Sequence, residues 1–174
     1  MAGTRKLGKP TDQRMAMLRT QTTDLLLNGK IRTTEARAKE VKALVDSIIA
    51  LAIKEKDNFE EVEVKVVKAK LDSKGHKVTE KATSKNGKEY LKVVKEEKME
   101  KRQKDMPSRL NARRRIMKKI NKVKDADGKN IDLTAKLFGE IADKYKDRTG
   151  GYTQIIKVGA RRGDNAEKVI LKLV

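Results

Sequence analysis

An excess of basic side chains constrains this chain more than any other feature of its sequence. Its 174 residues include 44 Lys and Arg against 25 Asp and Glu, which gives a formal net charge of +19 at pH 7. Charged residues make up 40% of the chain and hydrophobic residues 37%, so the core can only be modest and the fold must tolerate strong self-repulsion. This balance favours a small single domain that binds a polyanion over a compact enzyme.

The residue types that are missing exclude several kinds of site. Without Cys there is no disulfide, thiolate zinc site or cysteine nucleophile, and His76 is the only histidine. The acidic residues are scattered among lysines, and no Gly-rich phosphate loop occurs, so we expect no catalytic site, metal site or cofactor. The sequence also lacks an apolar run that could span a membrane and a signal peptide, which predicts a cytoplasmic protein without membrane contact.

Residues 1–53 contain a basic N-terminal segment followed by two helical patterns. Spacing of three or four positions predicts that the first helix buries Met15, Leu18, Thr22, Leu25 and Leu26. Thr11 or Asp12 would cap its start, and Asn28-Gly29 would end it because both residues tolerate the left-handed conformation. Residues 30–33 are typical of a short extended segment.

A second helix should follow this extended segment. Thr33 or Thr34 is a suitable N-cap, and Glu35 can pair with Lys39 one turn later. The helical spacing predicts that this second helix buries Val41, Leu44, Val45, Ile48, Ile49 and Ala52.

In the middle of the chain, residues 54–107, apolar and polar residues alternate instead of following the helical spacing. Alternation begins at Val62–Val66 and returns near 78–83 and 90–94, which predicts three strands. We interpret them as a β-meander that is followed by a highly charged stretch at 95–105. A disordered, solvated insertion is the alternative, because the segment is rich in Lys and Glu.

Two turns are predicted inside this middle segment. Asn86-Gly87 is typical of a hairpin with a type I′ turn, which requires positive φ at both central residues, and Ser73-Lys74-Gly75 would form the turn before it. Residues 54–105 carry 16 basic and 12 acidic side chains. Because this charge is nearly balanced, we expect the segment to face solvent.

From residue 108 the helical spacing returns. One helix should bury Leu110, Ile116, Met117, Ile120 and Val123, and another, from about Asp132, should bury Leu133, Leu137, Phe138, Ile141, Ala142 and Tyr145. Asp127-Gly128 predicts a turn between the two helices, and Gly150-Gly151 a break after the second. Residues 152–158 and 168–174 alternate and should pair as an antiparallel hairpin with a basic loop at its tip.

Three groups of residues are candidates for contacts with a nucleic acid. The first group runs from the N-terminal segment into the first helix and consists of Arg5, Lys6, Lys9, Arg14 and Arg19. The second is a cluster on one helix, Arg113, Arg114, Arg115, Lys118 and Lys119. The third surrounds the C-terminal hairpin and combines Gly150-Gly151-Tyr152 with Arg161-Arg162-Gly163-Asp164. Cations of this kind neutralise phosphates and release counterions, which predicts tight, salt-sensitive binding.

Each group also has a simpler interpretation. The first could be an ordinary solvated helix surface, and the helix dipole accounts for two charges of the second. In the third group Tyr152 could stack on a base, or its glycines could simply form turns, and Asp164 is more suited to orienting a guanidinium than to acting as a base. Because residues 106–174 carry 18 basic and eight acidic side chains, their clustering favours binding.

Several motifs, in the right order, resemble the L-seventeen family of bacterial large-subunit ribosomal proteins. The opening motifs are Arg5-Lys6-Leu7-Gly8-Lys9, Asp12-Gln13-Arg14-Met15-Ala16-Met17-Leu18-Arg19 and the run Gly29–Glu40 with the helix to Ala52. The closing motifs are Lys136-Leu137-Phe138, Arg148-Thr149-Gly150-Gly151-Tyr152-Thr153, Arg161-Arg162-Gly163-Asp164 and Leu171–Val174. The resemblance covers residues 1–53 and about 109–174. The middle segment is much longer than the connection that is usual in the family.

The resemblance implies an α+β fold in two layers, with a helix–strand–helices–β-hairpin core. We expect a single ribosomal-protein domain over residues 1–174, with a core of 1–53 and 108–174 and a β-rich insertion at 54–107. The implied role is a structural constituent of the large ribosomal subunit, bound to ribosomal RNA near the rim of the peptide exit tunnel. Its implied protein neighbours are L-twenty-two and L-thirty-two, and no homo-oligomer is expected.

Ten residues of this sequence match family positions that the resemblance places near RNA: Arg5, Lys6, Arg14, Arg19, Arg32, Arg37, Lys39, Tyr152, Arg161 and Arg162. The charge pattern and the closing motifs add Lys9, Arg113, Arg114, Lys118 and Arg148. A free-standing basic nucleic-acid-binding module is the alternative function. A small nuclease would need a compact carboxylate or histidine cluster, which the sequence does not display.

Overall fold

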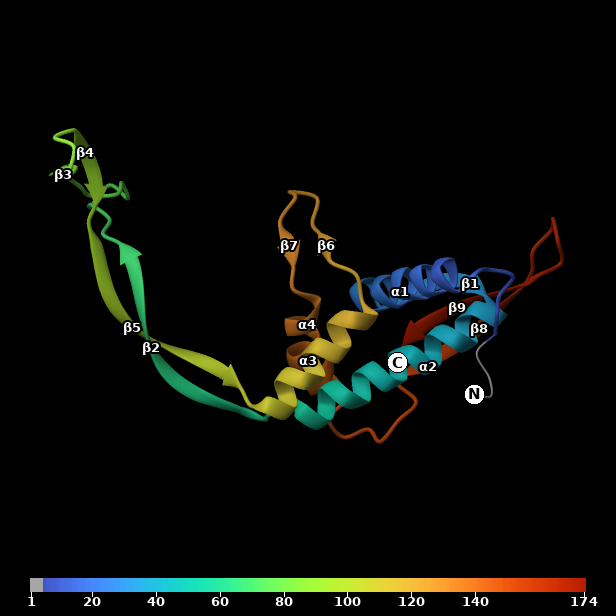
Figure 1. The fold of residues 1–174 in the computed structure, drawn as a ribbon. Coiled ribbons are helices and arrows are strands. Elements are labelled where there is room, and N and C mark those ends of the chain that lie inside the picture. The colour runs from blue at the N-terminus through green and yellow to red at the C-terminus, as the bar shows by residue number, and fades with distance from the viewer. Residues whose placement is uncertain (1–4) are drawn as a thin grey trace. The chain divides into compact units, whose positions relative to one another are not determined.

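The computed structural model describes residues 5–174, and they divide into two compact units (Figure 1). The first, which we call the body, comprises the described residues of Met1–Asn58 together with Asp105–Val174. The second, Phe59–Lys104, we call the β-arm. The bounds differ by a few residues from the expected core and insertion, because helix α2 continues to Glu55 and the Met106 N–H donates to the Asn58 carbonyl at 3.2 Å. That the whole chain acts as one domain stays a prediction.

Helix α1 spans Thr11–Asn28 and ends where the sequence predicts. Gly29 takes φ +74° and donates its N–H to the Leu25 carbonyl, which closes the helix with a left-handed cap. The start was predicted wrongly, because Pro10 holds the N-cap position and no side chain caps the helix. Leu18, Thr22, Leu25 and Leu26 are buried as predicted, whereas Met15 lies one turn too early to reach the core and is exposed.

Strand β1, Lys30–Thr34, leads directly into helix α2, Glu35–Glu55. Thr34 is at the N-cap of α2, but its side chain makes no capping hydrogen bond. The predicted pair between Glu35 and Lys39 is present at 2.9 Å. The predicted apolar face of α2 is buried, except that Leu44 is only half-buried, so α2 forms the centre of the core.

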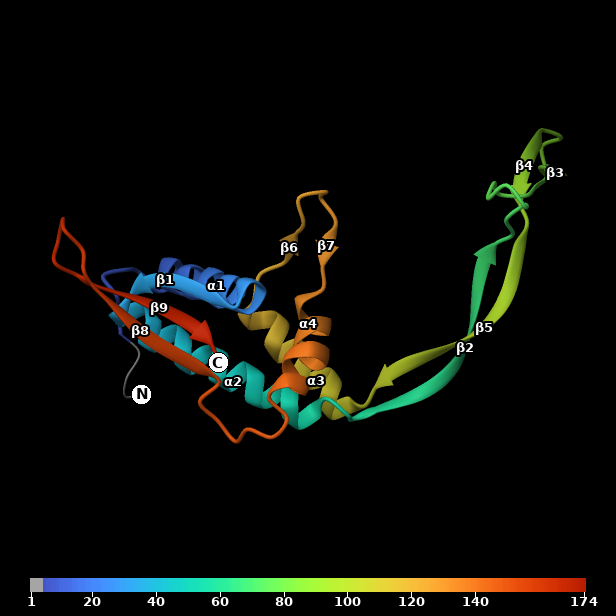
Figure 2. The same cartoon turned by 180° about the vertical axis from the view of Figure 1, so that it is seen from behind.

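A three-stranded antiparallel sheet forms the second layer of the body. The predicted C-terminal hairpin is present as β8, Thr153–Ala160, and β9, Glu167–Leu173, and β1 pairs with β9 to give the order β1-β9-β8. The views in Figures 1 and 2 show α1 and α2 beside this sheet. Side chains of one sheet face join the layers: the Thr153 hydroxyl donates to Asp46 of α2, and Gln21 of α1 donates to the Thr33 hydroxyl. The predicted two-layer α+β fold is confirmed.

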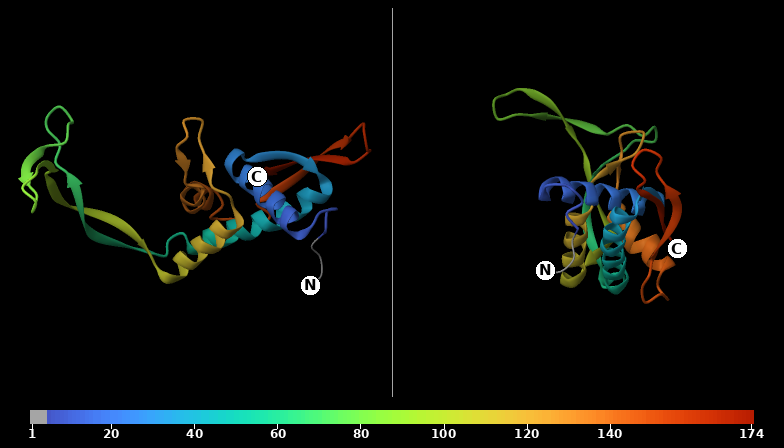
Figure 3. Two further views of the ribbon diagram at one scale, coloured as in Figure 1. Left: turned by 45° about the horizontal axis from the view of Figure 1, so that its top comes forward. Right: turned by 90° about the vertical axis from the view of Figure 1, so that its right-hand side faces the viewer.

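Helix α3, Pro107–Lys119, lies beside α2 (Figure 3) but is rotated from the predicted orientation. Its buried residues are Arg109, Ala112 and Ile116, while Leu110 is exposed and Met117 is 52% exposed. The reason is electrostatic. The Arg109 guanidinium pairs with Asp105 at 3.1 Å and lies over the Phe138 ring, so a charged residue takes the inward position that the apolar spacing assigned to Leu110.

The segment after α3 forms a short hairpin and then three short helical segments, of which the middle one is π-helical. Strands β6, Val123–Lys124, and β7, Asn130–Ile131, enclose the predicted turn at Asp127-Gly128. The predicted second helix is divided into α4, Leu133–Lys136, the π-helical turn η1, Leu137–Ile141, and α5, Ala142–Lys144. Every residue predicted to face inward from this helix is buried. Asp132 caps α4 by accepting from the Ala135 N–H at 3.0 Å.

The β-arm consists of strands, but they do not form a meander. Strand β2, Phe59–Ala69, pairs with β5, Lys95–Asp105, and the shorter β3, Thr79–Thr83, pairs with β4, Glu89–Val93. The β3–β4 hairpin therefore lies between the two strands of the β2–β5 pair in the chain order. The charged stretch at 95–105 was predicted to follow the strands and is itself a strand, because most of its Lys and Glu side chains remain exposed on a two-stranded ribbon.

The turn at Asn86-Gly87 is where the sequence predicts it, but its type is different. Only Gly87 takes a positive φ, +74°, and its N–H donates to the Ser84 carbonyl at 2.9 Å. A type I′ turn would need a positive φ at Asn86 as well. The Ser84 hydroxyl accepts from the Asn86 N–H and holds a turn that a left-handed glycine closes. The turn at Gly75, predicted from Ser73-Lys74-Gly75, also has its glycine at positive φ.

Candidate nucleic-acid interface

One face of the body sheet is covered by helices, and the other carries basic side chains. Strand pairing places Lys30 opposite Lys172 and Arg32 opposite Ile170, while Ile31 and Leu171 between them face the core. Lys30, Lys168 and Lys172 were not among the predicted contacts. The alternation of lysines and arginine with core residues in β1 and β9 could have identified them.

A basic groove lies where β1 meets α2 and the C-terminal hairpin. It has a volume of about 350 Å³, and its cations are Arg32, Arg37, Arg161 and Lys168. These four residues come from β1, α2, the β8–β9 loop and β9. The fold therefore brings the predicted Arg161, near the end of the chain, to the predicted Arg32 and Arg37, near its start, and adds Lys168.

A second groove of about 400 Å³ adjoins the first and shares Thr34 and Arg161 with it. It adds the predicted residues Arg5 and Lys39, but carboxylates offset their charge. Lys39 donates to Glu35 at 2.9 Å and, as the largest cause, lowers the pKa of that carboxyl below its usual range. Arg5 lies 4.0 Å from Glu40. The first groove is therefore the more strongly basic of the two.

The loop between β8 and β9 is held by an arginine–aspartate pair, as predicted for Asp164. Asp164 accepts from both the Nε and a terminal nitrogen of Arg161, with the Nε at 2.7 Å, and also accepts from the Ala166 N–H. The hydrogen bond with Arg161 is the largest cause that lowers the pKa of Asp164 to about 2. The pair therefore stays charged at neutral pH and fixes the loop, which presents Arg162 to solvent.

The cluster on α3 divides into exposed and engaged residues. Arg114, Arg115 and Lys118 are exposed, whereas Lys119 donates to the Ser47 hydroxyl of α2 at 3.2 Å. Arg113 was predicted to contact nucleic acid, but its side chain has a structural partner: its Nε donates to Asp105 at 2.6 Å. We therefore leave Arg113 out of the candidate surface.

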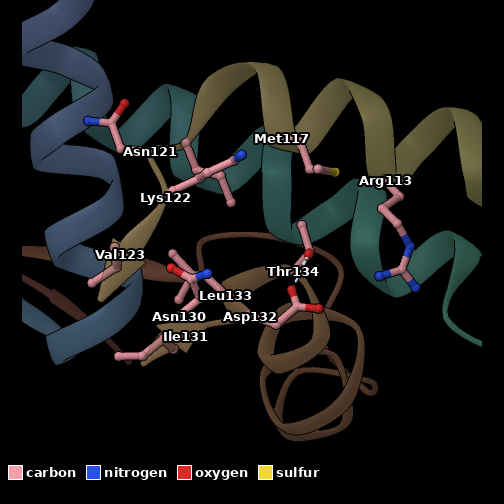
Figure 4. Close-up of a pocket in the computed structure, with 11 residues that line it drawn as sticks. Arg113, Met117, Asn121, Lys122, Val123, Asn130, Ile131, Asp132, Leu133 and Thr134 are labelled. Carbon is pink, nitrogen blue, oxygen red and sulfur yellow. Dashed lines mark hydrogen bonds between the residues drawn. The ribbon is translucent and has the colours of Figure 1, made fainter. Parts of the chain in front are cut away.

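An apolar groove of about 370 Å³ lies beside the exposed side of α3 (Figure 4). Met117 and Ile120 line it from α3 and its end, and Ile131 and Leu133 line it from the opposite side. Lys122 is at the groove as well. Of the α3 cluster Arg113 lines this groove and Arg114, Arg115, Lys118 and Lys119 do not, so the groove is not a second basic one.

The remaining predicted residues lie on separate parts of the body. Arg19 on α1 and Lys6 in the N-terminal segment are exposed, as is Arg148 after α5, while Lys9 and Arg14 are half-buried. Tyr152 was predicted to lie near RNA, with stacking on a base as one interpretation, but it is only 4% exposed. Its hydroxyl donates to the Arg148 carbonyl and its ring packs edge-on against Tyr145, so Tyr152 belongs to the core.

Residues 5–174 hold neither of two other kinds of site. Among these residues no cluster of His, Cys, Asp and Glu could hold a metal ion. Over the same range no helix has the length and apolar character needed to cross a membrane.

Comparison with known proteins then decides the family. The family model described as Ribosomal protein L17 matches residues 17–174. The chain belongs to the ribosomal protein L17 family. This is the L-seventeen family that its motifs resemble.

Curated L17 proteins match over their whole length. The protein named Large ribosomal subunit protein bL17 from Ruminiclostridium cellulolyticum is 58% identical over 174 residues, and that from Acetivibrio thermocellus is 55% identical over 174 residues. Both alignments cover 100% of each chain. The protein of the same name from Staphylococcus epidermidis is 37% identical, with 99% of each chain covered.

Membership of the L17 family establishes the general role. The chain is a structural constituent of the large ribosomal subunit, it takes part in translation as a component of the cytoplasmic ribosome, and it is not an enzyme. Its partners are ribosomal RNA and other ribosomal proteins.

Proposed function

We propose that this L17 protein binds large-subunit ribosomal RNA mainly through the basic groove and the neighbouring open face of the sheet. The observation that carries the proposal is the convergence of Arg32, Arg37 and Lys168 on one groove from separate elements, where Arg161 adds a cation whose charge Asp164 partly offsets. Like charges placed together repel one another, so this arrangement is favoured by an anionic partner that offsets them. A phosphate backbone supplies such charge at regular intervals.

The proposed surface has two further parts. Arg162 extends it along the β8–β9 loop, and the exposed Arg114, Arg115 and Lys118 of α3 form a separate contact. Arg5, Lys6, Lys9, Arg14, Arg19, Lys39 and Arg148 contribute weaker contacts from the N-terminal segment, the helices and the loop after α5. Lys and Arg contacts of this kind fix the position of a protein on RNA and do not read its sequence.

The position on the ribosome is also a proposal. The family resemblance supports a site near the rim of the peptide exit tunnel, next to L-twenty-two and L-thirty-two, with a single copy of the chain in each subunit. In that setting the core has one task, which is to hold the cations at fixed spacing against the folded RNA.

The decisive experiment compares two double variants with equal loss of charge. Arg32→Gln with Lys168→Gln removes two cations of the basic groove, whereas Lys54→Gln with Lys146→Gln removes two exposed cations elsewhere on the body. Affinity for large-subunit ribosomal RNA is measured by filter binding at several salt concentrations. The affinity falls with salt, so the slope of log K against log salt is negative. Each lost phosphate contact reduces the magnitude of this slope by about 0.7 to 0.9, so we expect a reduction of about 1.5 for the groove variant alone.

An equal change in both double variants would show that total charge matters and the groove does not. Circular dichroism melting of each variant confirms that the fold is retained. No salt dependence in the unmodified protein would overturn the proposal as a whole.

A further inference from the structure

The β-arm carries the most exposed aromatic ring of this chain. All five aromatic residues lie in the part that the structure describes, and among the tyrosines Tyr145 and Tyr152 are 3% and 4% exposed. Phe138 is buried and Phe59 is half-buried. Tyr90 on β4, by contrast, is 50% exposed. A ring that the fold leaves open to this extent is available to a partner.

Lysines lie on both sides of Tyr90 along the chain. Side chains alternate along a strand, so Lys92 lies on the Tyr90 side of β4 and Leu91 points to the other side, while Lys88 comes directly before the strand. The strand pairing places the small residue Ala82 opposite Tyr90, which leaves one face of the ring uncovered by a cross-strand side chain.

The charge of the β-arm is also uneven. Its β2–β5 ribbon carries seven basic and seven acidic residues, and Glu96 and Glu100 form ion pairs with Lys98 and Lys68. The segment beyond the ribbon, residues 70–94, carries seven lysines and three acidic residues, a net charge of +4. Within the described residues only Lys70 of these seven pairs with a carboxylate, Glu96 at 3.8 Å.

We propose that residues 70–94 form a second contact with ribosomal RNA, in which an unpaired base stacks on Tyr90 while Lys88 and Lys92 neutralise the adjoining phosphates. An aromatic ring flanked by cations is suited to this use because every base offers a face for stacking, whatever the sequence. A protein partner with an apolar surface would leave these lysines uncompensated and is therefore disfavoured. The inference rests on the proposed RNA-binding function, but it assigns that function to a unit whose nearly balanced total charge suggested a solvent-facing appendage.

The first test compares three variants of the full-length protein for affinity to large-subunit ribosomal RNA. Tyr90→Ala should weaken binding about tenfold, whereas Tyr90→Phe, which retains the ring, should bind as the unmodified protein does. Leu91→Ala is the matched control, because Leu91 is on the same strand, is 66% exposed and faces the other way. Equal losses for Tyr90→Ala and Leu91→Ala, or no loss for Tyr90→Ala, would overturn the inference.

The second test locates the contact in assembled subunits and uses the absence of cysteine from the chain. Asn86→Cys places a unique thiol in the exposed turn beside Tyr90, and Gly163→Cys places one in the β8–β9 loop, where an added Cβ meets no atom within 4 Å. An iron chelate attached to each thiol generates hydroxyl radicals that cleave nearby chains. We expect RNA cleavage from both positions, at different nucleotides.

The two positions separate the two proposals. RNA cleavage from residue 163 alone would overturn the contact at the β-arm and leave the proposed function standing. Cleavage of a neighbouring protein, rather than RNA, from residue 86 would likewise overturn the inference in favour of a protein partner. The absence of RNA cleavage from residue 163 would count against the hairpin loop of the proposed function.

Discussion

The body and the β-arm are built from similar residues but are stabilised differently. Both are basic and rich in Lys, yet the body buries a continuous apolar cluster from α1, α2, α3, η1 and the sheet. None of the residues in Phe59–Lys104 is fully buried. The β-arm is therefore held by strand hydrogen bonds and exposed side-chain pairs, which stabilise a two-stranded ribbon only marginally.

This difference decides how precisely each unit can place its charged side chains relative to one another. In the body a small core fixes the positions of Arg32, Arg37 and Lys168 well enough for them to form one groove. In the β-arm no core is present, so cations can be arranged only along a strand. The body is suited to a fixed multivalent contact and the β-arm to a local one.

The largest expected effect comes from a core substitution. Ile49→Ala removes a fully buried side chain of α2 and should lower the free energy of unfolding by about 3 kcal/mol through lost burial and the remaining cavity. Val67→Ala in the β-arm, where the side chain is exposed, should change it by less than about 0.5 kcal/mol. Urea denaturation followed by far-ultraviolet circular dichroism measures both. Similar losses would contradict the view that only the body has a core.

A smaller, pH-dependent effect is expected at Asp132. Its pKa is lowered mainly by the hydrogen bond from the Thr134 hydroxyl and also by the Ala135 N–H, so folding favours the ionised carboxylate. The stabilisation is complete above the ordinary pKa of 3.8 and is lost as the pH falls from there through the lower folded value. Asp132→Ala should therefore cost about 1 kcal/mol at pH 7 and progressively less below about pH 4.

Glu100 of the β-arm is the carboxylate to compare with Asp132 over the same pH range. Glu100 also has a lowered pKa, because Lys68 and Arg102 donate to it, but it lies half-buried on a ribbon that has no core. Glu100→Gln should leave the urea midpoint of the body unchanged at each pH. If Glu100→Gln lowered the urea midpoint as much as Asp132→Ala does, ion pairs of the β-arm would be shown to stabilise the body.

The smallest expected effect is that of removing the β-arm. Residues 59–104 can be replaced by two glycines, because the Met106 N–H already bonds to the Asn58 carbonyl. This deletion retains Lys56, which pairs with Asp143, and Asp105, which pairs with Arg109 and Arg113. The unfolding free energy of the body should change by less than about 0.5 kcal/mol. Sedimentation should still show incorporation into large subunits, because the basic groove keeps the main RNA contact and the β-arm adds only a second one. Loss of incorporation would mean that the β-arm is needed for assembly.

Local features of the fold were readable from the sequence. Gly29 ended α1 and the spacing from Val41 to Ala52 identified α2, because caps and helical periodicity depend on residues a few positions apart. The C-terminal hairpin was visible for the same reason. The nesting of β3–β4 between β2 and β5 was missed, because the pairing of distant strands leaves little trace in local alternation.

For the candidate surface the sequence identified many of the cations but could not arrange them. Arg113 and Tyr152 looked available, but Asp105 engages the first and the core takes in the second. The exposed ring is instead that of Tyr90, which belongs to none of the sequence motifs.

Charge, composition and short motifs therefore determined by themselves that this protein is a basic ribosomal constituent with an α+β body. Only the tertiary structure decided which cations share a groove, which are neutralised by carboxylates and which aromatic ring is left open. The reason is that charge is a property of the residue, whereas burial and pairing depend on which distant segments the core brings together.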